Sequence, residues 1–123
     1  MVRVLIADDE PLFGEALEVL LGVDDRIEVV GRALDGSEAV ELARELDPDV
    51  VLMDLSMPGV DGFVATERIL ARDRDAHVLV LSGSDDPADI AKAREAGAAG
   101  YITKDLIAER LVDAILDAVP ELP

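Results

Sequence analysis

The segment VVLMDLSMPGVDG, residues 50–62, decides the fold and raises the first question about function. Four apolar residues, Val50 to Met53, indicate a buried strand, and Asp54 follows where that strand should end. A Met57-Pro58-Gly59 turn comes next, and Asp61 is placed to cap a following helix. A buried strand followed by a turn and a helix is typical of a parallel sheet covered by helices.

The same alternation of strand and helix extends outward over the whole chain. We expect strands over residues 2–7, 27–33, 50–53, 77–81 and 98–102. We expect helices over residues 11–21, 39–46, 62–71, 87–97 and 106–119. The prediction is an α/β fold with a flavodoxin-like, doubly wound, five-stranded parallel sheet of order 2-1-3-4-5 and five helices. Residues 1–119 would form one domain, and residues 120–123 would begin a linker or C-terminal tail.

The composition limits the classes of function. A chain of 123 residues is long enough to bury one core, and it has no cysteine, which excludes disulfides, zinc-thiolate sites and thiol catalysis. The apolar stretch before the first acids is too short for a signal peptide, and no apolar run approaches the roughly 20 residues that span a bilayer. We therefore expect a soluble, cytoplasmic protein.

The charge of the chain bears on its partners. The formal net charge is −17, which opposes binding to a phosphate backbone or to anionic lipid. We expect no direct binding to nucleic acid and no membrane association. A cation or a basic protein surface suits this chain better.

Five chemically active residues follow the predicted strands. The first strand ends at Asp8 and Asp9, the third at Asp54, the fourth at Ser82, and the fifth runs to Lys104. In doubly wound sheets, ligands bind beyond the carboxyl ends of the strands, at the point where the strand order reverses. We expect these five side chains to converge there.

A cluster of this composition favours a metal and a phosphoryl group. Three neighbouring carboxylates repel one another, and a hard divalent cation relieves that repulsion; with few protein ligands and room for water, Mg²⁺ suits the site better than Ca²⁺. The turn after Asp54 is expected to leave its carboxylate open to solvent and to direct the backbone carbonyl of Ser56 toward the metal. An exposed carboxylate beside a metal is a nucleophile toward phosphorus, and Lys104 would neutralise phosphoryl oxygens.

Each of these residues has an ordinary interpretation when it is taken alone. Adjacent acids before a proline usually cap a helix, Asp54 could be a turn residue, Ser82 a loop residue, and Lys104 a solvated lysine. The combination is more specific, because the predicted fold places all of them at the ends of the appropriate strands.

The sequence closely resembles the receiver domain of bacterial two-component response regulators. The resemblance is carried by IADDEPLF (6–13), VLMDLSMPGVDG (51–62), LVLSGSDD (79–86) and AGAAGYITKD (96–105), in this order. It implies that a sensor histidine kinase transfers a phosphoryl group to Asp54. It also implies that Asp9, Asp54 and the carbonyl of Ser56 bind Mg²⁺, while Asp8 supports the metal through water.

The resemblance assigns further roles to residues around this acceptor. Ser82 and Lys104 would contact the phosphoryl group. Tyr101 matches the aromatic switch residue, whose ring would turn into space that Ser82 vacates on phosphorylation. The alternative for Tyr101 is a half-buried strand aromatic with its hydroxyl in water. Ser56 and Ser84 occupy positions that tune the lifetime of the phosphate.

The chain departs from the family pattern at two positions. Many receivers have proline, joined by a cis bond, after the lysine, whereas Asp105 follows Lys104 here. A cis bond to a residue other than proline costs ~2.5–4 kcal/mol, so we expect a trans bond or a strained cis bond. Ser82 replaces the more common threonine, which keeps the hydroxyl but loosens its rotamer and could weaken its coupling to Tyr101.

The flanking motifs are most similar to the NarL/FixJ-type subfamily, which carries a LuxR-like helix-turn-helix output. We expect a receiver that controls transcription through such an output domain, with a stand-alone receiver as the alternative. Homodimerisation on phosphorylation is expected. The chain would be no enzyme beyond its own phosphorylation on Asp54 and its autodephosphorylation.

Two other classes of function fit less well. A phosphohydrolase with an aspartyl nucleophile would carry D-x-D after the first strand and a cap insertion, whereas the acids here are adjacent and no cap insertion interrupts the pattern. A receiver that binds its partner without phosphorylation would be expected to lack some site residues, whereas all five positions are filled.

Overall fold

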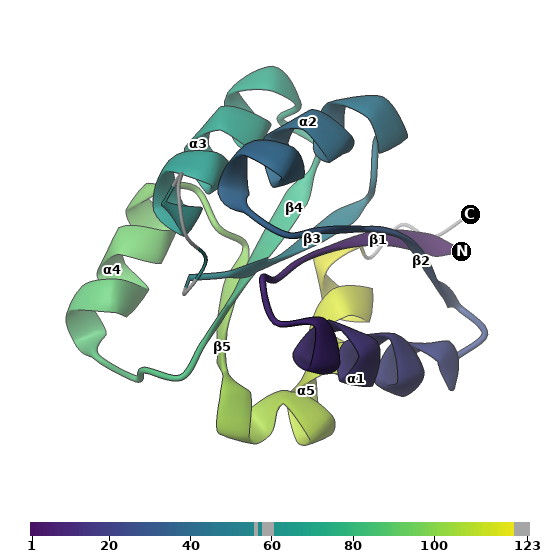
Figure 1. Cartoon of the computed structure of the whole chain (residues 1–123). Coiled ribbons are helices and arrows are strands. Elements are labelled where there is room, and N and C mark those ends of the chain that lie inside the picture. Colours follow the sequence, from purple (N-terminus) through teal and green to yellow (C-terminus); the bar gives the residue numbers. More distant parts are fainter. Residues whose placement is uncertain (56, 58–60, 120–123) are drawn as a thin grey trace.

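The sheet has the predicted strand order. A computed structural model describes residues 1–55, 57 and 61–119, and in this part of the chain five parallel strands run in the order β2-β1-β3-β4-β5 (Figure 1). The strands are β1 (Val2–Ala7), β2 (Ile27–Ala33), β3 (Val50–Asp54), β4 (His77–Ser82) and β5 (Gly100–Thr103). The helices are α1 (Pro11–Gly22), α2 (Gly36–Leu46), α3 (Gly62–Arg72), α4 (Pro87–Glu95) and α5 (Ile107–Ala118), with a 3-10 helix, η1 (Lys104–Leu106), before α5. The predicted fold class is confirmed.

Helices cover both faces of the sheet, and each face has its own apolar core (Figure 1). Leu17 and Leu21 of α1 pack with Leu111 and Ile115 of α5 on one face. Residues of α2, α3 and α4 pack on the other face. Because both faces are covered, the three inner strands β1, β3 and β4 are buried along nearly their whole length, which explains their largely apolar sequence, whereas the edge strands β2 and β5 are mostly half-buried.

Side-chain caps begin three of the helices; those of α3 and α4 stand at the predicted helix starts, whereas α2 begins at Gly36, three residues before its predicted start. Carboxylate oxygens of Asp35, Asp61 and Asp86 accept hydrogen bonds from backbone N–H groups of the first helical turn, at 2.7, 2.6 and 2.9 Å. These caps satisfy backbone N–H groups of α2, α3 and α4 that have no partner within their own helix.

Element boundaries differ from prediction where hydrogen bonding overrides the apolar pattern. Asp54 belongs to β3, because it pairs in register with Leu81 of β4. Helix α4 ends at Glu95 instead of Gly97, which has φ of 100°, a left-handed conformation that ends a helix and favours glycine. The segment expected to begin the last helix first forms η1, so α5 starts at Ile107.

Two further predictions concern the ends and the environment of the chain. Residues 120–123 lie outside the described residues, so the division into a domain and a tail stays a prediction. Among the described residues, every helix is too short or too polar to cross a bilayer.

Candidate functional site

Three carboxylates meet at the carboxyl edge of the sheet, as predicted. Strands β1 and β3 are neighbours, and their register pairs Ala7 with Met53, the residues that precede Asp8 and Asp54. Asp9 is the next residue after Asp8. One oxygen from each of the three side chains lies within 4.8 Å of the other two. We call Asp8, Asp9 and Asp54 the acid trio.

Burial makes the acid trio electrostatically costly. Asp8 is 2% exposed, and burial away from water raises the pKa of its carboxyl to about 7, with a further contribution from the neighbouring Asp54. The hydrogen bond that Asp8 Oδ1 accepts from the Glu10 N–H, at 2.7 Å, opposes this rise. Within the described part of the chain, Asp8 Oδ2 is buried and accepts no hydrogen bond. A proton or a cation at that oxygen would relieve the cost.

The donor set of the acid trio fits Mg²⁺. Three carboxylates at one edge supply hard oxygen ligands, and the unsatisfied Oδ2 of Asp8 is the kind of buried atom that a metal-bound water would bond. Asp9 is the most exposed of the three and reaches the solvent from which an ion would enter. The Ser56 carbonyl, predicted as a further ligand, lies outside the described residues.

Lys104 contacts Asp54, and the exposure of Asp54 differs from the prediction. Its Nζ lies 3.0 Å from Asp54 Oδ2, and the Asp54 side chain is only 1% exposed. The carboxylate is therefore buried in this structure, whereas the sequence predicted it to be open to solvent. The lysine covers it because opposite charges attract strongly where water is excluded. The predicted proximity of Lys104 to Asp54 is confirmed.

Phe13 is a neighbour of the site that the sequence analysis did not identify. The Lys104 ammonium lies 4.5 Å from the centroid of the Phe13 ring, within the range of a cation–π interaction. Phe13 stands in the first turn of α1 and is partly buried against the core shared by α1 and α5. Its place in an apolar helical pattern indicated only a core residue, and nothing in the sequence paired it with Lys104.

The three remaining predicted residues form a hydrogen-bonded group beside the acid trio. Ser82, the last residue of β4, is buried, and its Oγ accepts a hydrogen bond from the Ser84 N–H at 3.1 Å. The Tyr101 hydroxyl donates to the Ser84 carbonyl at 2.7 Å. Strand β3 pairs with β4, and Asp54 lies opposite Leu81, so Ser82 follows directly after the residue that pairs with Asp54. The hydroxyl of Tyr101 thus has a protein partner instead of water alone.

The peptide bond between Lys104 and Asp105, for which the sequence allowed either a trans or a strained cis form, is trans. No bond between described residues is cis, and Lys104–Asp105 is among them. The chain turns into η1 at this point without a proline.

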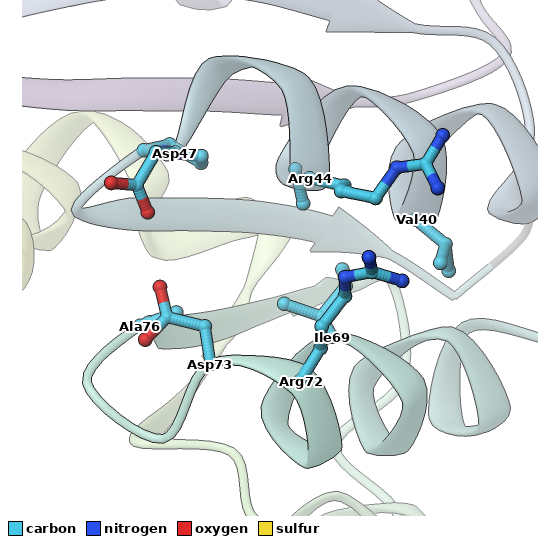
Figure 2. Close-up of a pocket in the computed structure, with 9 residues that line it drawn as sticks. Val40, Arg44, Asp47, Ile69, Arg72, Asp73 and Ala76 are labelled. Carbon is cyan, nitrogen blue, oxygen red and sulfur yellow. The ribbon is translucent and has the colours of Figure 1, made fainter.

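A cavity lies at the opposite edge of the sheet from the acid trio. It has a volume of about 280 Å³ and opens between α2 and α3, with an apolar floor that includes Val40 and Ile69. Arg44 and Arg72 extend across it from the two helices, and Asp47 and Asp73 lie toward its other end (Figure 2). Its rim carries two charges of each sign. It therefore lacks the concentration of like charge that marks the acid trio.

The chain matches the family of response regulator receiver domains over residues 4–116. The transcriptional regulatory protein LiaR of Bacillus subtilis is 44% identical over 115 residues, which cover 94% of this chain and 54% of LiaR. The nitrate/nitrite response regulator protein NarL of Escherichia coli is 35% identical over 115 residues, which cover 94% of this chain and 53% of NarL. The chain thus spans about half the length of the curated relatives that it matches.

A similarity in three dimensions accompanies the similarity in sequence. The crystal structure of a two-component response regulator of the LuxR family from Aurantimonas sp. SI85-9A1 superposes with a TM-score of 0.93 at 38% identity, covering 98% of this chain and 86% of that one.

Proposed function

This chain belongs to the family of response regulator receiver domains, of the NarL/LuxR type, and from that premise we propose that it accepts a phosphoryl group on Asp54 from a sensor histidine kinase. The observation that carries the proposal is the convergence of the acid trio with Lys104. Buried like charges that destabilise a fold are typical of sites where a ligand or a reaction compensates for them.

The chemistry assigns one step to Asp54. A carboxylate oxygen of Asp54 attacks phosphorus, the bond from phosphorus to the donor nitrogen breaks, and the imidazole of the donor histidine leaves with the electron pair. The product is an acyl phosphate on Asp54. Later attack by water on phosphorus releases inorganic phosphate and restores the carboxylate. The protein performs no other reaction in this proposal.

Residues around Asp54 lower the barrier by charge and position. Lys104, now 3.0 Å from Asp54, would donate to an oxygen of the incoming phosphoryl group. Asp9 and Asp54 would hold Mg²⁺ together with the Ser56 carbonyl, and Asp8 would hold a metal-bound water. Bound Mg²⁺ would neutralise charge on the carboxylates and on the phosphoryl oxygens.

The switch is proposed to run from Ser82 to Tyr101. A phosphoryl group on Asp54 would attract the Ser82 hydroxyl, which now accepts from the Ser84 N–H. The loop that carries Ser84 would shift, and Tyr101 is tied to that loop through the Ser84 carbonyl. The surface near β5 would then change. Ser56 and Ser84 are proposed to tune the lifetime of the phosphate.

The output is proposed from the relatives. LiaR is a transcriptional regulatory protein, and the residues that match this chain cover 54% of its length. We propose that the receiver controls transcription through an output domain and by homodimerisation, in the cytoplasm, without contacting nucleic acid or membrane itself. A receiver that acts alone, or without phosphorylation, is the alternative.

Incubation with phosphoramidate and MgCl₂, followed by intact mass spectrometry, tests the acceptor. We expect a mass gain of one phosphoryl group in the wild type and no gain with EDTA or in Asp54→Asn. A labelled Asp54→Asn protein would contradict the assignment of the acceptor. An unlabelled wild type that is folded and also fails to bind beryllofluoride, a stable substitute for the phosphoryl group, would support the phosphorylation-independent alternative.

A further inference from the structure

The Lys104 ammonium is held between two partners of different kinds. Asp54 Oδ2 lies 3.0 Å from Nζ on one side, and the Phe13 ring centroid lies 4.5 Å from it on another. The two partners come from distant parts of the chain, β3 and the first turn of α1. The lysine side chain is 28% exposed, so water does not fully screen either interaction.

The ring attracts the ammonium without occupying its donors. A carboxylate in the place of Phe13 would form a second ion pair and would compete with a phosphoryl group for the three N–H donors of the lysine. The face of an aromatic ring attracts a cation through its quadrupole and carries no net charge. The N–H donors therefore stay available to Asp54 and to a phosphoryl oxygen.

A contact with the ring limits the number of conformations that the flexible lysine side chain can adopt. The lysine side chain has four rotatable carbons, and ordering it costs conformational entropy. In the proposed phosphorylation a phosphoryl oxygen joins the partners of Lys104, whose Nζ now donates to Asp54 Oδ2. Phe13 packs, partly buried, against the core of α1 and α5, so its ring has a support of its own that does not depend on the anion beside Lys104.

We propose that Phe13 is a positioning residue, which holds the Lys104 ammonium at the site during phosphoryl transfer. This inference rests on the proposed phosphorylation of Asp54. It predicts that the aromatic ring at residue 13, and not only its apolar volume, affects the rate of phosphorylation.

Rate measurements on variants of Phe13 separate the effect of the aromatic ring from the effect of apolar volume at this position. At saturating Mg²⁺, Phe13→Leu should lower the rate constant for phosphorylation by phosphoramidate about three- to tenfold, since a partly desolvated cation–π contact has a free energy of that order. Phe13→Tyr keeps the ring and should stay near the wild-type rate. In a Lys104→Met background, Phe13→Leu should have little further effect. An equal loss in both backgrounds would overturn the proposal, because the effect would not act through Lys104.

A second measurement does not depend on phosphorylation. The chain has only two lysines, so lysine-labelled protein gives two sets of Cε signals, and Lys104→Met identifies one of them. We expect an upfield ring-current shift of the Lys104 Hε protons that Phe13→Leu removes and Phe13→Tyr retains. Lys92, whose Nζ lies 5.9 Å from the Phe63 ring centroid, serves as the unchanged internal reference.

The two measurements distinguish failure of the inference from failure of the proposed function. A wild type that accepts no phosphoryl group would contradict the proposed function, and the ring-current shift would still decide whether Phe13 holds Lys104. Absence of that shift would overturn the inference whatever the phosphorylation result. A shift without any effect of Phe13→Leu on the rate would also overturn it.

Discussion

The two ends of the sheet carry charge in opposite ways. At the amino end, the cavity between α2 and α3 has Arg44, Arg72, Asp47 and Asp73 around it, and the first three of these are exposed to water (Figure 2). At the carboxyl end, the acid trio gathers three like charges, two of them on buried residues, with Lys104 beside them. Exposed charges of both signs cost little, whereas buried like charges destabilise the metal-free fold. The difference marks the carboxyl end as the place where a bound cation would offset an electrostatic cost.

The largest effect is expected for Mg²⁺ binding at the carboxyl end. Asp9→Ala removes a proposed direct ligand and should weaken Mg²⁺ binding about 100-fold, or ~2.7 kcal/mol, whereas Asp8→Asn removes a water-mediated contact and should cost about tenfold. Isothermal titration calorimetry of each variant with MgCl₂ measures both. Equal losses in the two variants would refute the division of roles between Asp8 and Asp9.

The next effect concerns stability and pH in the absence of divalent cations. Burial raises the pKa of Asp8 to about 7 from an ordinary 3.8. Between these values the folded protein holds a proton that the unfolded chain has lost, so the free energy of unfolding should fall as pH rises from about 4 to about 7. Asp8→Asn should remove this pH dependence and raise the free energy of unfolding by on the order of 2 kcal/mol at pH 8.

Urea unfolding followed by far-ultraviolet circular dichroism, in EDTA at pH 5 and pH 8, measures the effect of Asp8→Asn. The variant and the wild type should differ more at pH 8 than at pH 5. Parallel pH profiles would mean that Asp8 does not carry the electrostatic cost assigned to it.

A smaller effect is expected beside the acid trio. Tyr101→Phe removes the hydrogen bond that the hydroxyl donates to the Ser84 carbonyl, and a part-buried bond of this kind contributes about 1 kcal/mol. Urea unfolding of Tyr101→Phe should show a free energy of unfolding that is lower by this amount. An unchanged midpoint would indicate that water replaces the hydroxyl fully, and Tyr101 would then be poorly coupled to the loop of Ser84.

The smallest effects are expected at the amino end, and they sharpen the comparison. Asp47 has a φ of 49°, which asparagine tolerates, and its side chain is exposed. Asp47→Asn and Arg72→Ala should change the free energy of unfolding by less than about 0.5 kcal/mol and leave phosphorylation unaffected. They are matched controls for the carboxyl-end variants, measured in the same assays. A large loss of stability or of phosphorylation in either variant would contradict the difference proposed between the two ends of the sheet.

Much of the fold could be predicted because its local signals agree with one another. Apolar runs marked the strands, and the helix starts predicted after Asp61 and Asp86 are those of α3 and α4, whereas α2 begins at Gly36, three residues before its predicted start. The errors arose where tertiary hydrogen bonds decide the outcome. Pairing with β4 extends β3 to include Asp54, and no local pattern could show that.

The site was predicted in its residues but not in all of its geometry. Strand ends identified Asp8, Asp9, Asp54, Ser82 and Lys104, because topology alone brings such ends together. The burial of Asp54 under Lys104 depends on side-chain conformation, which sequence patterns do not report. The ring of Phe13 beside Lys104 depends on how α1 and the end of β5 approach in space.

The position of Tyr101 has a spectroscopic consequence. The chain contains one tyrosine and no tryptophan, and the phenol of that tyrosine donates its hydrogen bond to the loop that follows β4. The tyrosine fluorescence therefore reports on a single residue, at the proposed switch. The protein carries its own optical probe there, so a titration with beryllofluoride could be followed without any added label.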